Sequence, residues 1–368
     1  MADRLRPAHG RAGAPGPQLG HGLEQRLLDF LADVVAGREP RGGEIDDAFA
    51  GLLRGCGLTV LAQRRGLRHA SFAALERDLF VKTSFVEQMS GWSVEKLAGA
   101  GLRCATLKGP ALAVQLFGDG VTRPSSDVDL LVPEGELERA LAVFRAAGMR
   151  VEARHAAWYE RRWHCHMVLD GGPQPRLPVE LHWSIARPGL TRGALDGLFD
   201  DVVEVQCSGR RLPAPDLEWQ LLICAVHAVQ HYFAPRPLLD VALIARRLDE
   251  RQWRAVARRA RSLRIGPAVH YATTVSARRL GWVAPAAAEE LRPAPWRDAV
   301  ARRVIARLPV TGRISRRKIQ AMKAVTPLLT TSTPLFVVGL AFQLTDRPRI
   351  ADALWRRQRS RRDDPLGP

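Results

Sequence analysis

The segment SDVDLLV at residues 126–132 places two aspartates, Asp127 and Asp129, one residue apart on an apolar run. If this run is a β-strand, both side chains point to one face, because side chains alternate along a strand. A third carboxylate, Glu180, lies in the apolar, strand-like segment VELH at residues 179–182. Three converging acids with no Cys or His among them suit a hard divalent cation such as Mg²⁺. Because phosphoryl and nucleotidyl transfer need this ion, the pattern predicts a metal-dependent transferase that uses a nucleoside triphosphate.

Each acid also has a structural interpretation. Asp127 follows two serines and suits a turn or a cap, and Asp129 suits the surface of a strand. The second interpretation conflicts with the pattern VDLLV, which is typical of a strand buried on both faces, where an unpartnered aspartate is costly. Metal ligation is therefore the favoured hypothesis. Because three close carboxylates repel one another without metal, it also predicts that Asp129→Asn leaves the melting temperature of the metal-free protein unchanged or raised.

Short elements alternate around these acids. Gly109 and Pro110 end the first strand, and Pro110 suits the first turn of the helix that follows, where its missing N–H is harmless. The expected strands cover residues 103–107, 127–132, 149–153, 164–169 and 177–185, and the expected helices cover residues 111–117 and 134–147. Alternating elements followed by strands predict an α+β fold with a small mixed sheet.

Helical periodicity dominates on both sides of this unit. Residues 23–37, 45–63 and 71–100 have apolar residues at helical spacing, with interruptions expected near Gly66 and at Ser90–Gly91. From Asp216, a plausible N-cap, helices continue to about residue 308. The predicted regions are a disordered leader (1–22), an N-terminal helical region (23–100), an α/β core (101–212), a helical C-terminal domain (213–355) and a basic tail (356–368).

The composition is that of a globular protein, with 46% hydrophobic and 25% charged residues. The five cysteines are scattered, odd in number and without CxxC spacing, which argues against a disulfide framework or a structural zinc site. The N-terminus has no apolar core of the kind found in secretory signals. These features predict a reducing, cytoplasmic environment.

The net charge of +17 is concentrated in the last third of the chain. From Arg246 onward there are 27 Lys and Arg residues and 9 Asp and Glu residues. Residues 1–245 contain 28 Lys and Arg and 29 Asp and Glu, so their charges almost cancel. Solvated Arg-rich helix faces are the favoured explanation, and a surface for a polyanion is the alternative. With few interleaved aromatic residues and no nucleic-acid motif, the sequence does not favour nucleic acid as the primary partner.

One segment invites a comparison with membrane proteins. Residues 324–345 carry no charge and follow a basic cluster that begins at Arg313. Two prolines and several hydroxyl residues make the segment less apolar than a typical membrane span, so a buried helix or loop is favoured. A peripheral membrane contact through residues 313–345 is the alternative.

The motif residues resemble the nucleotidyltransferase-fold superfamily, which includes DNA polymerase β and the antibiotic nucleotidyltransferases. Its pattern of a glycine turn, a short helix, Asp-x-Asp and a later acid is matched by Gly109, Asp127, Asp129 and Glu180. A bacterial family of uncharacterised nucleotidyltransferases is a nearer match over roughly residues 25–345. The shared features are LKG at 107–109, Arg123 before SDVDLLV, E-x-H-W at 180–183, His227, and L-x-D ending at Asp240.

The resemblance implies two Mg²⁺ ions and an NTP as co-substrate. Asp127 and Asp129 would bind the ion that carries the triphosphate and would share the second ion with Glu180, which is also the candidate general base.

The resemblance also implies a set of triphosphate contacts, made by Lys108, Gly109, Arg123 and Ser126. The order Lys108-Gly109-Pro110 departs from the superfamily's Gly-Gly or Gly-Ser turn. Pro110 offers no N–H to a phosphate, and Lys108 supplies a point charge in its place.

Other polar residues keep two interpretations. His182 shares a face with Glu180 and would be either a substrate or supporting residue of the site or a satisfied core histidine. Asp240 would either cap the helix that follows two prolines or reach the substrate cleft. The pairs His164/His166 and His227/His231 each share a face, but no third ligand at sensible spacing supports a transition-metal site.

Two classes of function remain open at this stage. The first is an enzyme that moves a nucleoside monophosphate from an NTP to a hydroxyl-type acceptor, a small molecule because no basic groove accompanies the acids. The second is a non-catalytic scaffold whose basic C-terminal third binds an anionic partner or membrane. A transfer of the γ-phosphate has the same metal requirement. The acceptor, the nucleobase and the oligomeric state are not encoded in these patterns.

Overall fold

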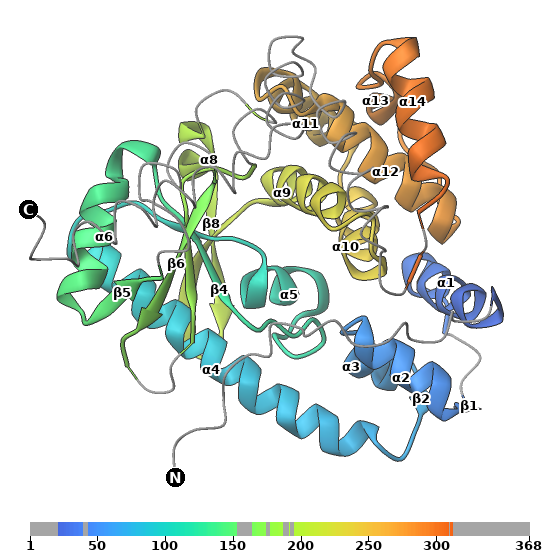
Figure 1. Ribbon diagram of the computed structural model, residues 1–368, viewed down its shortest axis with the longest axis horizontal. Helices are drawn as coiled ribbons and strands as arrows, with labels where there is room; N and C mark the ends of the chain where they lie inside the picture. Colours follow the sequence, from blue (N-terminus) through green and yellow to red (C-terminus); the bar gives the residue numbers. More distant parts are fainter. Residues whose placement is uncertain are drawn as a thin grey trace, which may run out of the picture.

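The computed structural model describes residues 21–39, 43–152, 164–173, 177–186, 191, 195–308 and 310–311. Its centre is a five-stranded sheet with the strand order β3-β4-β7-β6-β5 (Figure 1). The strands are β3 (Ala105–Thr106), β4 (Val128–Leu131), β5 (Met149–Val151), β6 (His166–Gly171) and β7 (Val179–His182). Only β4 and β7 pair in parallel, and the other neighbours are antiparallel. The α+β fold with a mixed sheet and the adjacency of the two acid-bearing strands are therefore confirmed.

Side-chain alternation gives this sheet two chemically different faces. Val128 and Leu130 of β4 and Leu181 of β7 pack on one face against α4 (Phe72–Gly99) and α6 (Leu137–Ala146), which follows the 3₁₀ turn η1 (Glu134–Glu136). Asp129 and Glu180 occupy the intervening positions and point to the other face. The acids thus lie on the face turned away from the main apolar core of the sheet.

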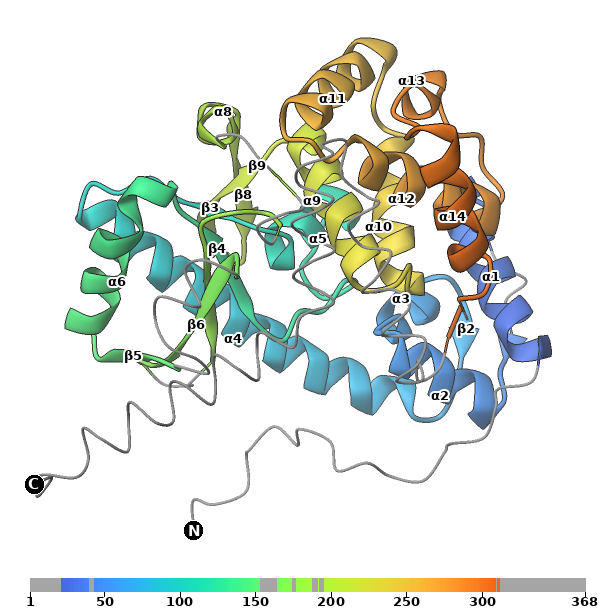
Figure 2. The same cartoon turned by 45° about the horizontal axis from the view of Figure 1, so that its top comes forward.

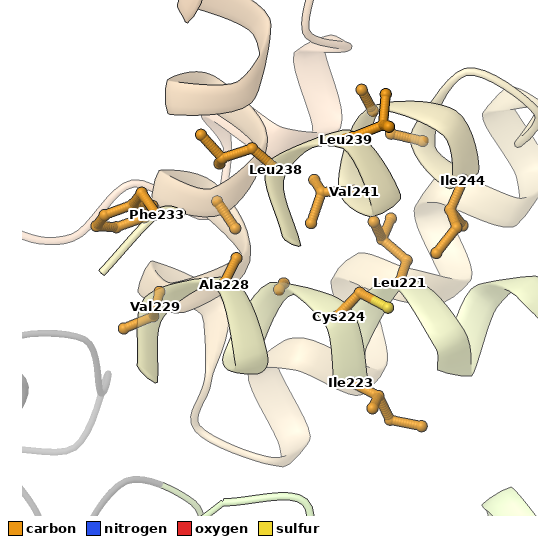
Figure 3. Close-up of a cluster of buried hydrophobic side chains, with 14 of the residues drawn as sticks. Leu221, Ile223, Cys224, Ala228, Val229, Phe233, Leu238, Leu239, Val241 and Ile244 are labelled. Atoms are coloured by element: carbon orange, nitrogen blue, oxygen red, sulfur yellow. The ribbon is translucent and has the colours of Figure 1, made fainter. Parts of the chain in front are cut away.

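The C-terminal helices form a second, all-helical half beside the sheet (Figure 2). They are α9 (Leu217–Gln230), α10 (Pro235–Ala245), α11 (Glu250–Ser262), α12 (Gly266–Leu280), α13 (Ala286–Glu289) and α14 (Pro295–Ile305). Figure 3 shows the apolar contact of α9 with α10, where Cys224 and Ala228 of α9 face Leu238 and Val241 of α10. Asp216 caps α9 by accepting a hydrogen bond from the Trp219 N–H, as predicted.

The N-terminal helices connect the two halves. Helix α1 (His21–Ala36) packs on α10 and α12. The strands β1 (Gly43–Glu44) and β2 (Leu67–Arg68) form a small parallel pair on either side of α2 (Asp47–Gly55) and α3 (Thr59–Arg64) in the chain, and β2 leads into α4. Helix α4 then runs beneath the sheet (Figure 1).

The interruption of α4 expected at Ser90–Gly91 is wrong. The Ser90 hydroxyl donates to the Val86 carbonyl one turn earlier and stays within the helix. A Cβ atom at Gly91 would lie 2.5 Å from Cδ of Arg210. Gly91 therefore allows a close contact between α4 and the segment that carries Arg210, which a single sequence cannot distinguish from a break.

A β-hairpin that was not predicted precedes α9. It consists of β8 (Val202–Cys207) and β9 (Arg210–Pro215), follows α8 (Asp196–Asp200), and turns at Ser208–Gly209, both with positive φ. Two central residues with φ > 0 are the geometry of a tight hairpin turn. Thr106 of β3 donates to the Pro213 carbonyl, which joins this hairpin to the central sheet.

No helix in the described part of the chain is both long and apolar enough to cross a membrane. Residues 313–345, for which a peripheral membrane contact was the alternative, lie outside the described residues, as do residues 1–20 of the expected leader and the tail at 356–368.

Candidate active site

The turn from β3 into α5 (Gly109–Phe117) is made by two consecutive residues with positive φ, Lys108 at 49° and Gly109 at 48°. For Lys108, with ψ −123°, this conformation is normally reserved for glycine and costs roughly 1–3 kcal/mol. The Lys108 carbonyl accepts the first helical hydrogen bond, from the Leu112 N–H at 2.9 Å. A lysine in a backbone conformation that favours glycine indicates that its ammonium group has a function at this turn.

That ammonium group reaches Asp129. Lys108 Nζ lies 3.3 Å from Asp129 Oδ2, and His182 Nε2 donates to Asp129 Oδ1 at 2.9 Å. Burial disfavours the charged carboxylate, but Lys108 and His182 outweigh burial and hold the pKa of Asp129 well below its ordinary value. In the same way, Asp129 outweighs burial and raises the pKa of Lys108. Asp129 is thus a fully ionised carboxylate neutralised from two sides.

Glu180 lies directly beside Asp129 in the parallel register of β4 and β7. One donor atom from each of Asp129, Glu180 and His182 lies within 4.8 Å of the other two. The hydrogen bond from His182 lowers the pKa of Glu180. His182, as its shared face with Glu180 suggested, belongs to this acidic cluster and interacts with both carboxylates.

Asp127 stands at the entrance of β4. The hydroxyl groups of Ser125 and Ser126 lie 3.3 and 3.4 Å from its Oδ1. Burial first, and then repulsion from Asp129 and Glu180, raises the pKa of Asp127. The repulsion between acids that the sequence predicts therefore acts on Asp127.

This geometry corrects the prediction that Asp129→Asn leaves the melting temperature of the metal-free protein unchanged or raised. The prediction assumed that Asp129 is repelled in the metal-free protein, but its carboxylate is held by Lys108 and His182. Neutralising Asp129 removes a favourable acceptor and should lower the melting temperature.

Arg123 and Asp240 form a closed ion pair. Arg123 Nε and Nη2 donate to the two Asp240 oxygens at 2.8 and 2.7 Å, and the residues are 6% and 1% exposed. Asp240 lies inside α10, whose N-cap is Ala234, so the capping interpretation of Asp240 is wrong. The pair joins the loop before β4 to the helical half of the molecule.

These groups surround one cavity of about 390 Å³ between β4, α5, α9 and α10. Seven of the nine site residues predicted from the sequence contribute to its wall: Lys108, Gly109, Arg123, Ser126, Asp127, Asp129 and Asp240. Glu180 and His182 are not part of the wall and lie behind Asp129. The structure therefore brings together residues from the β3–α5 turn, β4 and α10 around a single space.

The sequence analysis missed one cation in the wall, Arg236. Its Nη2 donates to the Pro124 carbonyl, and its buried Nε has no hydrogen-bond partner among the described residues. Burial, followed by the nearby Arg123, lowers the pKa of Arg236 to about 10, so it is charged at neutral pH. The sequence did carry a signal for this position: the run PRP at residues 235–237 suits the first turn of a helix, and Arg236 lies inside it.

His227 and His231 of α9 also face this cavity, with ring centroids 4.1 Å apart. His227 Nδ1 lies 3.4 Å from Lys108 Nζ. Burial, followed by the charge of Lys108, holds the pKa of His227 well below its ordinary value and also lowers that of His231. A neutral His227 can accept a hydrogen bond from the Lys108 ammonium group.

The residues fit a hard divalent ion. The donor set offered by Asp127, Asp129 and Glu180 consists of carboxylate oxygens, the ligands that Mg²⁺ prefers. Burial, followed by repulsion from Asp129 and Glu180, raises the pKa of Asp127, and a bound cation would offset that repulsion.

Comparison with known families identifies the chain. Residues 60–281, more than half of the sequence, match the family described as uncharacterised nucleotidyltransferase. The chain belongs to this family. It is accordingly an enzyme, a nucleotidyltransferase, and every site residue expected from the sequence lies inside the matched span.

Two solved structures of the antibiotic-resistance factor ANT(2'')-Ia are similar to this nucleotidyltransferase. The solution structure has 15% identity and a TM-score of 0.34, and covers 49% of this chain and 93% of its own. The crystal structure in complex with adenylyl-2''-tobramycin has 16% identity and a TM-score of 0.32, and covers 49% and 98%. Likenesses of this strength carry no argument about the site. Among curated proteins, none matches the chain.

Proposed function

We propose that this nucleotidyltransferase moves a nucleoside monophosphate from an NTP to a hydroxyl group of a small molecule. The observation that carries the proposal is the parallel register of Asp129 with Glu180, in which Asp129 lies beside Lys108 at the wall of one cavity. We further propose that Asp127, Asp129 and Glu180 hold two Mg²⁺ ions. Such ions, when bound, neutralise the triphosphate and lower the pKa of the attacking hydroxyl.

Lys108 has two partners in this scheme. In the metal-free site its ammonium group neutralises Asp129 at 3.3 Å. Lys108 also lies at the cavity wall, on a strained turn. With a divalent ion on Asp129, its ammonium group would be free to supply a positive charge to the triphosphate and to the leaving pyrophosphate, whose negative charge develops during transfer.

The rest of the phosphate site would come from the cavity wall. Gly109 allows a close approach of the backbone at the start of α5, and Ser126 offers a hydroxyl group at the entrance of β4. Arg123, fixed by Asp240, and Arg236, which has no carboxylate partner among the described residues, add two guanidinium groups. Arg236 in particular remains available to an anionic group of a ligand.

Glu180 and His182 would control the proton. Glu180 is an ionised carboxylate next to Asp129 and is therefore placed to accept the proton of the acceptor hydroxyl. His182 donates to Asp129 and lies 3.6 Å from Glu180 Oε2, which fixes the orientation of both carboxylates.

A small acceptor agrees with the size of the cavity. Its volume of about 390 Å³ falls within the range of roughly 300–1,000 Å³ that is usual for small-molecule sites. The five cysteines are all unpaired, which suits a reducing compartment, and we propose the cytoplasm as the place of action.

Mass spectrometry of the products tests the proposal. The pure protein is incubated with each NTP, Mg²⁺ and a panel of hydroxylated metabolites, and products are sought that have gained a nucleoside monophosphate. Asp129→Asn serves as the inactive control, and Asp170→Asn, an exposed aspartate of β6, as the matched active control. Products that gain only a phosphate would instead identify γ-phosphate transfer. A protein that binds no Mg-NTP and forms no product would contradict the proposal and favour the scaffold.

A further inference from the structure

A second group of side chains that could hold a metal ion lies beside the carboxylates, and two of its members, Cys165 and His166, play no part in the proposed transfer. His166 of β6 and His182 of β7 are direct partners across the antiparallel pair, and their ring centroids are 4.8 Å apart. Cys165, immediately before β6, contributes a thiol whose Sγ lies 3.7 Å from His166 Nδ1. One donor atom from each of Cys165, His166 and His182 lies within 4.8 Å of the other two.

Glu180 adds an oxygen to this group. Its Oε2 lies 3.6 Å from Nε2 of His166 and 3.6 Å from Nε2 of His182. Donor atoms around a tetrahedral zinc ion, with bonds of about 2.0–2.3 Å, are separated by about 3.3–3.7 Å. The carboxylate therefore lies near Nε2 of both imidazoles, whereas the Cys165 thiol approaches Nδ1 of His166, so an ion held by all four residues requires the His166 ring or the Glu180 side chain to move.

We propose that Cys165, His166 and His182 form a binding site for a thiophilic divalent ion of the zinc type, with Glu180 as the fourth ligand. The donor set of sulfur, two imidazole nitrogens and one carboxylate oxygen is that of zinc sites and is unsuited to Mg²⁺, which prefers oxygen. None of these four residues belongs to the wall of the cavity, so the site lies beside the space for the NTP and not inside it. His166 and Glu180 are 29% and 27% exposed at their side chains, which gives an ion access from solvent.

The two metal sites share His182 and Glu180. In the metal-free protein His182 Nε2 donates to Asp129 at 2.9 Å, so His182 already connects the two clusters. Zinc that draws Glu180 and His182 toward Cys165 removes a ligand and a supporting hydrogen bond from the Mg²⁺ side. Zinc is therefore an antagonist of Mg²⁺ binding, a consequence that rests on the proposed function, whereas the zinc site itself does not.

Titration of the full-length protein with Zn²⁺ and with Co²⁺ tests the inference. Co²⁺ replaces Zn²⁺ and reports a thiolate ligand by a sulfur-to-cobalt charge-transfer band in the near ultraviolet. We expect one bound ion and this band in the wild type. Cys165→Ser should abolish the band, and both Cys165→Ser and His166→Gln should weaken Zn²⁺ binding by about tenfold or more.

Cys207→Ser is the matched control, because Cys207 is a buried thiol in the β8–β9 hairpin, distant from this cluster. It should keep the band and the affinity. Circular dichroism establishes that each variant is folded, and the partly exposed His166 gives a second test should Cys165→Ser unfold. A wild type without the band, or equal Zn²⁺ binding by the Cys165 and Cys207 variants, would overturn the inference.

The link to Mg²⁺ is measured separately. Excess Mg²⁺ should raise the apparent Kd for Zn²⁺ without moving the cobalt band. If Mg²⁺ has no effect while the band depends on Cys165, the zinc site stands and the antagonism between the two ions fails.

Discussion

Two buried sets of opposite charges lie at the same cavity and are built differently. Arg123 and Asp240 satisfy each other through two short hydrogen bonds, and the pair is closed. Asp129 is shared between Lys108 at 3.3 Å and His182 at 2.9 Å, and Lys108 is shared in turn with His227 at 3.4 Å. Short bidentate geometry fixes a structure, whereas longer, divided contacts can be exchanged when a ligand arrives. The first set therefore holds Arg123 in place at the cavity, and the second is the candidate for chemistry.

The largest effect that separates the two sets should be on activity. Asp129→Asn should reduce kcat by about 10⁴-fold or more, equivalent to about 5.5 kcal/mol, because a metal ligand is lost. The same substitution should lower the free energy of unfolding by about 1–3 kcal/mol, since Lys108 and His182 lose a charged acceptor. Single-turnover kinetics and urea unfolding measure the two quantities. Full activity in a folded variant would remove Asp129 from the mechanism.

The closed pair should respond mainly in stability. Asp240→Asn leaves the Arg123 guanidinium buried without its counter-ion, which should cost about 3–5 kcal/mol of unfolding free energy. The double variant Arg123→Met, Asp240→Leu removes both charges and should be more stable than Asp240→Asn. Chemical denaturation of the three proteins checks this order. A single variant as stable as the wild type would show that the pair is not closed in solution.

Substitutions of Lys108 can separate the effect of backbone strain on stability from the effect of the positive charge on activity. Both Lys108→Gly and Lys108→Ala should lower kcat/KM by about 10²-fold, because each removes the positive charge beside the phosphates. Glycine accepts φ 49° without strain, so Lys108→Gly should be more stable than Lys108→Ala by about 1 kcal/mol, despite glycine's greater freedom in the unfolded chain. Thermal unfolding compares the two variants. Equal stability would mean that the turn is not strained in solution.

The smallest effect concerns pH and His227. Burial is the main cause of its lowered pKa, the charges of Lys108, His231 and Arg123 lower it further, and Asp129 opposes them. The pKa of this histidine in the unfolded chain is about 6.5, so below that pH the unfolded chain binds a proton that the folded chain does not bind. The free energy of unfolding therefore rises with pH and decreases as pH falls.

For one such histidine the slope approaches about 1.4 kcal/mol per pH unit below pH 6.5. His227→Gln should reduce that slope relative to the wild type, as measured by urea unfolding between pH 5 and 7.5 on about half-unit steps. Parallel stability curves for the two proteins would contradict the assignment of a neutral, buried His227.

Prediction from the sequence succeeded where local periodicity carries the information. The alternation in SDVDLLV and VELH placed Asp129, Glu180 and His182 on one face, and the structure has Asp129 and Glu180 in register. It failed where the residue type has several uses. Gly91 was expected to interrupt α4 and is instead a site of close packing, and the hairpin of β8 and β9 was missed although Ser208–Gly209 supplied a turn signal.

The sequence by itself determined the family, the mixed sheet and the face that carries the acids, because side-chain alternation and turn chemistry are local properties of the chain. Only the tertiary structure decided which buried charges neutralise one another. Arg123 meets Asp240 across 117 residues, and Lys108 meets His227 across 119. Such pairs depend on how the helical half closes on the sheet, and the free energy of a buried charge is set by these distant partners. The roles of the two charge sets follow from that closure.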